Sequence, residues 1–138
     1  MPYNYGVMPD QPVVKQRTIL LVEDDVFLSN LLLTRLQKAG FRVVKAMTGE
    51  EALGVLRSAE APDLILLDII LPQKSGFEVL EEIQSDPNLN KAPVIITSNL
   101  GQETDIKRGK QLGVISYFVK AQTPIDKLVG EIQKILGK

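Results

Sequence analysis

The sequence predicts an α/β fold in which a doubly wound, open parallel sheet is covered by helices on both faces. Two observations predict it. Short apolar runs alternate about five times with stretches of helical periodicity. The runs are almost continuously apolar, which is typical of parallel strands that are buried on both faces. Parallel strands joined through helices require right-handed crossovers, and such sheets bind their ligands at the carboxyl ends of the strands.

The first elements follow from their end signals. The runs expected to form strands are residues 19–22, 41–46, 64–67, 94–96 and 117–119. Gly40 is expected to close the first helix, which begins before Leu28, because glycine favours the position after a helix end. Thr48 and Glu51 form the pattern of a capping box and predict the start of the second helix.

The last two predicted helices differ in their apolar content, and therefore in how strongly we expect them to pack against the rest of the domain. The fourth, near residues 103–112, contains Gly109 and few apolar residues, and glycine lowers helix stability by about 1 kcal/mol relative to alanine, so a loosely held helix is predicted. The last has Thr123 as expected N-cap and Pro124 at its first position. Its apolar stripe consists of Ile125, Leu128, Val129, Ile132, Ile135 and Leu136.

Size and composition limit the kind of protein. The 138 residues correspond to one domain, and 44% apolar with 24% charged residues, in short apolar runs, predict a soluble globular chain without a membrane span. A net charge of −1 does not indicate nucleic-acid binding. Residues 1–17 are interpreted as a flexible tail and residues 18–138 as the domain. The tail lacks a secretory signal pattern, so a cytoplasmic location is expected.

Cysteine and histidine are both absent from the chain. Their absence excludes disulfide bonds, thiol nucleophiles, zinc sites of the Cys/His type, Ser-His-Asp triads and phosphohistidine on this protein. The chemistry that remains uses carboxylates, lysines and hydroxyl groups.

Polar residues follow the apolar runs, where the carboxyl ends of parallel strands meet at one edge. The first run ends in Glu23-Asp24-Asp25, the third in Asp68, the fourth in Thr97-Ser98 and the fifth in Lys120. Several carboxylates in one crevice repel each other unless a cation lies between them, and hard divalent ions prefer such oxygen ligands. The pattern therefore indicates Mg²⁺ as a cofactor.

Each of these residues also has a purely structural interpretation. Asp25 precedes a helix and is expected to be its N-cap. Lys120 alone is typical of a solvated surface lysine, and Ser98 alone of a helix cap. Asp68 is different, because it lies between apolar residues where an unpaired carboxylate costs several kcal/mol. The functional interpretation therefore rests on the whole set.

From residue 18 to its end, the chain resembles the receiver domain of two-component response regulators. The matching segments are Ile19–Asp25, Pro62–Asp68, Leu71-Pro72, Gly76, Pro93–Ser98 and Tyr117–Lys120. The resemblance implies a flavodoxin-like fold with five parallel strands in the order 2-1-3-4-5. Each segment is a weak signal, but the ordered set is highly specific.

The resemblance also implies roles for the residues. Asp68 would accept a phosphoryl group from the phosphohistidine of a partner histidine kinase or phosphotransfer protein. Glu23, Asp24, Asp68 and the backbone carbonyl of Ile70 would hold Mg²⁺, while Lys120 would neutralise charge on the transferred group. The switch residues would be Ser98 and Tyr117. A downstream protein would bind the face formed by the fourth helix, fifth strand and fifth helix.

Such a module takes part in its own phosphorylation and in slow autodephosphorylation rather than acting as an enzyme. No residues are left for an output domain, so a stand-alone receiver is expected, as a monomer or a phosphorylation-dependent dimer, without nucleic-acid or membrane partners.

Four positions depart from the family pattern. Ala121 replaces a proline that often follows a cis bond, so the Lys120-Ala121 bond is either trans with a reshaped loop or held cis by other contacts. Asn99 is larger than the usual residue and is expected to narrow access to the site. Ile70 and Leu100 are apolar where rapidly hydrolysing receivers carry polar groups, which predicts a long-lived phosphoryl group.

Ala121 and Asn99 are also the support for an alternative: a pseudo-receiver that binds partners independently of phosphorylation. A hydrolase with an aspartyl nucleophile on the first strand would need Asp-x-Asp followed by a small hydroxyl residue, and residues 23–27 do not supply this pattern. A flavin site would need a phosphate-binding loop at the same place, where acids stand instead.

Overall fold

A computed structural model describes residues 15–58, 60–89 and 91–137. Residues 1–14 of the predicted tail lie outside the described residues, and residues 15–17 have no regular secondary structure. Among the described residues, every helix is too short or too polar to cross a bilayer.

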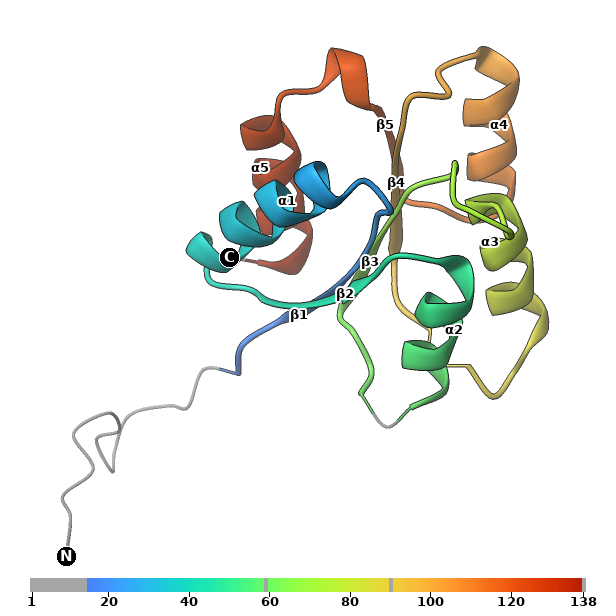
Figure 1. The fold of residues 1–138 in the computed structure, drawn as a ribbon, viewed down its shortest axis with the longest axis horizontal. Helices are drawn as coiled ribbons and strands as arrows, with labels where there is room; N and C mark the ends of the chain where they lie inside the picture. Colours follow the sequence, from blue (N-terminus) through green and yellow to red (C-terminus); the bar gives the residue numbers. More distant parts are fainter. Residues whose placement is uncertain (1–14, 59, 90, 138) are drawn as a thin grey trace, which may run out of the picture.

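Five parallel strands form one sheet in the order β2-β1-β3-β4-β5, which confirms the predicted fold class (Figure 1). The strands are β1 (Thr18–Val22), β2 (Arg42–Ala46), β3 (Leu64–Leu67), β4 (Val94–Ser98) and β5 (Ser116–Val119). The helices are α1 (Val26–Lys38), α2 (Gly49–Arg57), α3 (Gly76–Ser85), α4 (Glu103–Gln111) and α5 (Ile125–Leu136).

The helices cover both faces of the sheet: α1 and α5 lie on one side, and α2, α3 and α4 on the other (Figure 1). Successive residues of β1 contribute to different cores, because strand side chains alternate between faces. Leu20 packs in the cluster with α2 and α3, whereas Ile19 and Leu21 pack in the cluster with α1 and α5. All three are fully buried. The double burial explains why the strand sequence is almost continuously apolar.

Helix α1 begins and ends as its sequence predicts. The Asp25 side chain accepts a hydrogen bond from Leu28 N at 3.0 Å, which confirms Asp25 as the N-cap. After the last turn, Gly40 has a φ of +97°, which glycine adopts without steric cost. The cap fixes where β1 stops and α1 starts, and thereby places the acidic residues between them.

Helix α2 has the predicted cap but a modified box. The Thr48 hydroxyl accepts from Glu51 N at 3.1 Å, as expected. The Glu51 carboxylate, however, accepts from Met47 N at 3.3 Å rather than from the N-cap residue itself. The side chain therefore reaches one residue further back than the standard pattern.

The expected start of α5 is wrong by one residue. Thr123 is not the N-cap: the helix begins at Ile125, and Pro124 occupies the cap position with an extended ψ of 146°. The carbonyl oxygen of Pro124 accepts the first helical hydrogen bond, from Leu128 N at 3.2 Å. Because proline fixes only φ, the residue suits the cap as well as the first turn, and sequence spacing alone does not separate the two positions.

Helix α4 contacts the core mainly through Gly109, the only buried residue of its nine. A Cβ placed on Gly109 would lie 3.0 Å from side-chain atoms of both Ile96 and Tyr117. The glycine therefore permits close approach to the sheet as well as lowering helix propensity. The effect of Gly109→Ala would therefore include steric overpacking against Ile96 and Tyr117 as well as the change in helix propensity.

Gly76, at the start of α3, is expected to tolerate no side chain. A Cβ there would lie 2.3 Å from the backbone oxygen of Asp68 and 2.8 Å from Ile69 Cα. We expect Gly76→Ala to lower the free energy of unfolding by about 3 kcal/mol, measured by urea denaturation. The matched control is Gly54→Ala in α2, where a Cβ meets nothing within 4 Å and a gain of about 0.5–1 kcal/mol is expected. Equal effects of the two substitutions would show that the close contacts at Gly76 do not limit its side chain.

Candidate functional site

The candidate site lies at the carboxyl ends of β1 and β3. Val22 pairs with Leu67 in the parallel register, so the residues that follow them, Glu23 and Asp68, emerge side by side. Carboxylate oxygens of Glu23, Asp24 and Asp68 all lie within 4.8 Å of one another. Glu23 and Asp68 are 1% and 3% exposed, whereas Asp24 is exposed. The three predicted acids therefore form one cluster.

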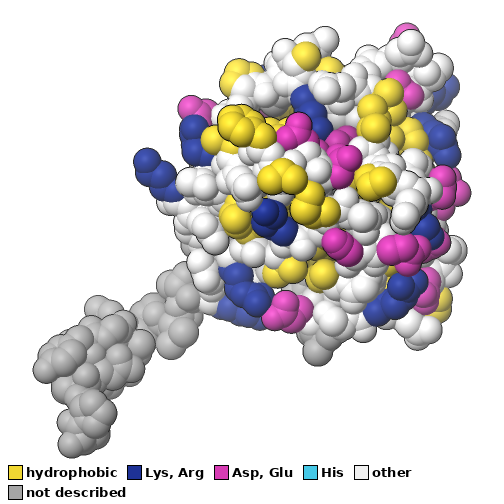
Figure 2. All heavy atoms as spheres, viewed as in Figure 1, with side chains coloured by type: hydrophobic (Ala, Val, Ile, Leu, Met, Phe, Trp, Pro, Cys, Tyr) yellow, Lys and Arg dark blue, Asp and Glu magenta, His cyan; other side chains and the backbone are white. Residues whose placement is uncertain are grey.

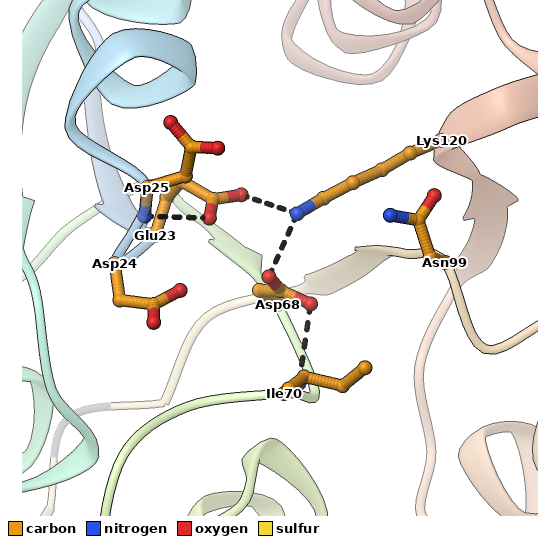
Figure 3. A pocket seen from close by; sticks show the side chains of 7 residues that line it. All are labelled: Glu23, Asp24, Asp25, Asp68, Ile70, Asn99 and Lys120. Carbon is orange, nitrogen blue, oxygen red and sulfur yellow. Dashed lines mark hydrogen bonds and ion pairs between the residues drawn. The ribbon is translucent and has the colours of Figure 1, made fainter.

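Lys120 reaches this cluster from the end of β5. Its Nζ lies 2.7 Å from Glu23 Oε1 and 2.7 Å from Asp68 Oδ2 (Figure 3). The described residues contain no cis peptide bond, so the Lys120-Ala121 bond is trans, and residues Lys120–Gln122 form a short 3-10 turn. The loop is thus reshaped without proline and still aims the ammonium group at the acids.

Backbone amides fix the two buried carboxylates. Glu23 Oε2 accepts from Asp25 N at 3.1 Å, and Asp68 Oδ1 accepts from Ile70 N at 3.2 Å. Each carboxylate therefore has one oxygen near a backbone N–H and the other near the Lys120 ammonium. The arrangement orients both groups before any ligand binds.

The electrostatics of the cluster are strongly coupled. Burial raises the pKa of Glu23, and the charge of Asp68 raises it further, although Lys120 and the Asp25 N–H act in the opposite direction. Burial by itself lowers the pKa of Lys120, but its hydrogen bonds to Asp68 and Glu23 and their charges bring the net pKa above the ordinary value. Three carboxylates facing one ammonium leave the cluster with a deficit of positive charge.

The acids and the lysine line an open cleft of about 390 Å³. Its lining residues are Glu23, Asp24, Asp25, Asp68, Ile70, Asn99 and Lys120. The Asp25 carboxylate points away from Asp68, consistent with its role as a helix cap (Figure 3). Figure 2, viewed as in Figure 1, shows acidic side chains gathered near the ends of the central strands with hydrophobic side chains around them.

Of the four positions that depart from the family pattern, Asn99 and Ile70 line this cleft and Leu100 does not. Leu100 is half-buried and packs against the core on the α2 and α3 side. The expected apolar wall beside Asp68 is therefore formed by Ile70, whose side chain is 55% exposed. The sequence could not distinguish the two positions, because both follow a strand end in the same way.

Ser98 and Tyr117, the two predicted switch residues, lie behind the cleft rather than in its wall. Ser98 is fully buried, and its hydroxyl accepts from Leu100 N at 3.3 Å. The Tyr117 hydroxyl donates to the backbone oxygen of Leu100 at 2.5 Å. Both side chains therefore hold the backbone of Leu100, in the loop between β4 and α4. Leu100 directly follows Asn99, which lines the cleft.

Tyr117 is expected to titrate at unusually high pH. Burial, followed by the charges of Asp105 and Asp68, raises its pKa from 10.0 to about 12. Because the folded pKa is raised, the stabilising contribution of the neutral hydroxyl is complete below the unfolded pKa of 10.0 and is lost as the pH rises through about 12. An ultraviolet titration of tyrosinate should show this late step, and Tyr117→Phe should remove it. A late step that persists in Tyr117→Phe would contradict the assignment.

Two structurally important side chains, those of Asp63 and Lys74, have no role predicted from the sequence. The Asp63 carboxylate accepts from Thr18 N at 2.7 Å and thereby ties the starts of β3 and β1 together. Lys74, between β3 and α3, forms ion pairs with Glu50 and Glu82. Pro62 and Asp63 directly precede the third apolar run, a position that indicates a residue at the start of a strand. No spacing rule indicates a role for Lys74.

The donor set fits a hard divalent cation such as Mg²⁺. Carboxylate oxygens from Glu23, Asp24 and Asp68 converge, and Ile70 lines the same cleft. A bound cation would offset the excess negative charge of the cluster. The cleft as a whole therefore combines a buried carboxylate, an ammonium group and a set of oxygen ligands.

Comparisons with known proteins agree with this arrangement. Residues 19–133 match the family model of the response regulator receiver domain. Protein PilH of Pseudomonas aeruginosa is 35% identical over 79% of this chain and 87% of its own length. CpxR of Klebsiella pneumoniae, a transcriptional regulatory protein, is 38% identical over 87% of this chain and 49% of its own. The chain thus spans about half the length of several curated relatives that it matches.

Solved structures show the same fold. The phosphorylated cyanobacterial phytochrome response regulator RcpA is 36% identical, with a TM-score of 0.74 over 88% of this chain and 91% of that one. The receiver domain of a putative LuxO repressor protein from Vibrio parahaemolyticus is 27% identical, with a TM-score of 0.78 over 89% and 92%. The family model spans all five strands and reaches into α5. The chain therefore belongs to the receiver domain family of two-component response regulators.

Proposed function

We propose that this receiver is a phosphoacceptor of a two-component relay, phosphorylated on Asp68 by the phosphohistidine of a partner kinase or phosphotransfer protein. One observation carries the proposal: the buried Asp68 carboxylate lies 2.7 Å from the Lys120 ammonium in a cleft that three further acids line. We further propose that the domain acts in the cytoplasm, as a monomer or a phosphorylation-dependent dimer.

In the proposed transfer, an Asp68 oxygen attacks phosphorus, forming a P–O bond as the P–N bond of the phosphohistidine breaks. Lys120 stabilises the negative charge on the transferred oxygens, and its ion pairs hold the Glu23 and Asp68 carboxylates close together. Glu23, Asp24, Asp68 and the Ile70 carbonyl would hold Mg²⁺, which supplies further charge neutralisation to phosphoryl transfer. The backbone N–H of Ile70 orients Asp68 throughout.

The response would spread through the loop between β4 and α4. The Ser98 hydroxyl, one residue before the cleft residue Asn99, would turn from Leu100 N toward a phosphoryl oxygen. Tyr117 holds the oxygen of Leu100, so movement of the loop changes the surroundings of its side chain. Since Gly109 is the only buried residue of α4, that helix can shift its position at a small cost in packing energy. The face formed by α4, β5 and α5 would then bind a downstream protein.

The pseudo-receiver alternative finds no specific support. Its two arguments were Ala121 and Asn99, yet Lys120 still reaches both buried acids and the cleft remains open beside Asn99. A titration with Mg²⁺ and beryllofluoride, followed by ¹⁵N nuclear magnetic resonance, separates the two functions. We expect saturable shifts at Ser98 and Tyr117 only when both reagents are present, and none in Asp68→Ala. Identical spectra with and without the reagents would favour the pseudo-receiver.

Ile70 is expected to lengthen the life of the phosphoryl group. Its apolar side chain lines the cleft and can neither orient nor activate an attacking water molecule. We predict that Ile70→Asn accelerates dephosphorylation by roughly tenfold or more, since general acid-base assistance contributes factors of about 100 or above when well aligned. The matched control is Leu100→Asn, outside the cleft lining, with a smaller effect. Loss of the phosphoryl group within seconds from the unmodified protein would contradict this prediction.

A further inference from the structure

The segment between β3 and α3 carries Ile70, whose carbonyl belongs to the proposed cation ligands. Near the strand the segment is well anchored. Ile70 N donates to Asp68 Oδ1 at 3.2 Å, and Gly76 N donates to the oxygen of Ile69 at 2.8 Å. These bonds close the base of the loop formed by residues 70–75, whose first residue, Ile70, lines the cleft.

The outer part of this loop has a strained backbone. Gln73 has a φ of +68°, which non-glycine residues rarely adopt, and Lys74 N donates to the oxygen of Pro72 at 2.7 Å. The combination is a γ-turn of the rare kind, and such a conformation persists only where surrounding contacts hold it.

Lys74 supplies contacts of that kind on two sides. Its Nζ lies 3.0 Å from Glu50 Oε1 at the start of α2, and it also contacts the Glu82 carboxylate of α3. The hydrogen bonds that Lys74 donates to Glu82 and Glu50 raise its pKa, so it stays charged at neutral pH. Its side chain is only 19% exposed, unlike that of a typical surface lysine.

The backbone of the same residue is also confined. A Cβ on Gly49, the buried first residue of α2, would lie 3.3 Å from both the carbonyl oxygen and the Cβ of Lys74. The loop thus packs directly on the start of α2, and the Lys74 ammonium fastens it between α2 and α3. Only three residues separate Lys74 from Ile70, and the γ-turn lies within this short stretch.

We propose that Lys74 is a positioning residue for the cation site, which it serves by fastening the loop that presents the Ile70 carbonyl. The inference rests on the proposed function, because it assumes that Mg²⁺ binds at Glu23, Asp24 and Asp68. Lys74 touches neither the cation ligands nor the transferred group. It acts through the loop backbone, and it also links the site to α2 and α3, away from the α4, β5 and α5 face.

Lys74→Met tests the proposal, because methionine keeps the length of the side chain and removes the ammonium. We expect Mg²⁺ affinity to fall by about tenfold, comparable with the loss of an outer partner of a metal ligand. In the metal-free variant, the backbone amide at position 74 should exchange faster than in the unmodified protein. Lys74→Arg retains a positive charge between Glu50 and Glu82 and should restore most of the affinity.

The matched control is Arg42→Met, which breaks an exposed ion pair between Arg42 and Glu60. Neither of these residues belongs to the loop of residues 70–75. We expect its Mg²⁺ affinity to equal that of the unmodified protein. Unchanged affinity in Lys74→Met, while the unmodified protein binds Mg²⁺ normally, would overturn the positioning role and leave the proposed function intact. Failure of the unmodified protein to bind Mg²⁺ would overturn both. An equal decrease in Lys74→Met and Lys74→Arg would also refute the proposed role of the charge.

Discussion

Replacing Lys120 with methionine is expected to slow phosphorylation by acetyl phosphate by about 100-fold or more, the usual effect of removing one preorganised charge-stabilising group. The Lys120 ammonium lies 2.7 Å from both Glu23 and Asp68 and is the only basic group that lines the described cleft. Without it, charge that develops on the transferred oxygens loses a stabilising partner. The rate is measured by intact-mass spectrometry over time at saturating Mg²⁺.

The control for this substitution is Lys127→Met, which removes an exposed lysine of α5 and should leave the rate unchanged. Lys120→Met also leaves two buried carboxylates unpaired, so its folding must be verified by circular dichroism at saturating Mg²⁺. A folded Lys120→Met variant that is phosphorylated at the normal rate would show that Lys120 has only a structural role.

Asp24→Asn is expected to weaken Mg²⁺ binding by at least about tenfold, because it removes a full charge from a proposed direct ligand and not from an outer partner. Asp24 is the exposed member of the acid cluster, so the substitution leaves the buried pair with Lys120 intact. The affinity is measured by a Mg²⁺ titration of the ¹⁵N spectrum.

Asp25→Asn is a stringent control because it makes the same chemical change, a carboxylate to an amide, at the next residue. Asp25 lines the same cleft, but its side chain caps α1, and asparagine is an equally good N-cap. Its Mg²⁺ affinity should therefore change little. Equal losses in Asp24→Asn and Asp25→Asn would mean that the acids attract the cation only through their summed charge.

The sheet could be predicted from the sequence because its signal is local and redundant. Leu64–Leu67 is fully apolar since both sides of β3 are covered, and polar residues mark its end. Helix ends depend on finer choices. Thr123 is the better N-cap by residue type, and only the backbone angles show that Pro124 takes the cap position.

The site was predictable where strand ends bring residues together. The parallel register of β1 and β3 places Glu23 beside Asp68, so the residues that follow the two strands meet at one edge of the sheet. Contacts made across loops were not predictable. The ion pairs of Lys74 join three separate elements, and Leu100 packs its side chain against the core while its backbone oxygen accepts from Tyr117.

The central claim is that Asp68 accepts a phosphoryl group, and intact-mass spectrometry tests it most directly. The protein and Asp68→Ala are each incubated with acetyl phosphate and Mg²⁺, and their masses are compared. We predict one phosphate adduct on the unmodified protein, dependent on Mg²⁺, and none on Asp68→Ala. An adduct of equal yield on Asp68→Ala, or no adduct on the folded unmodified protein, would contradict the assignment.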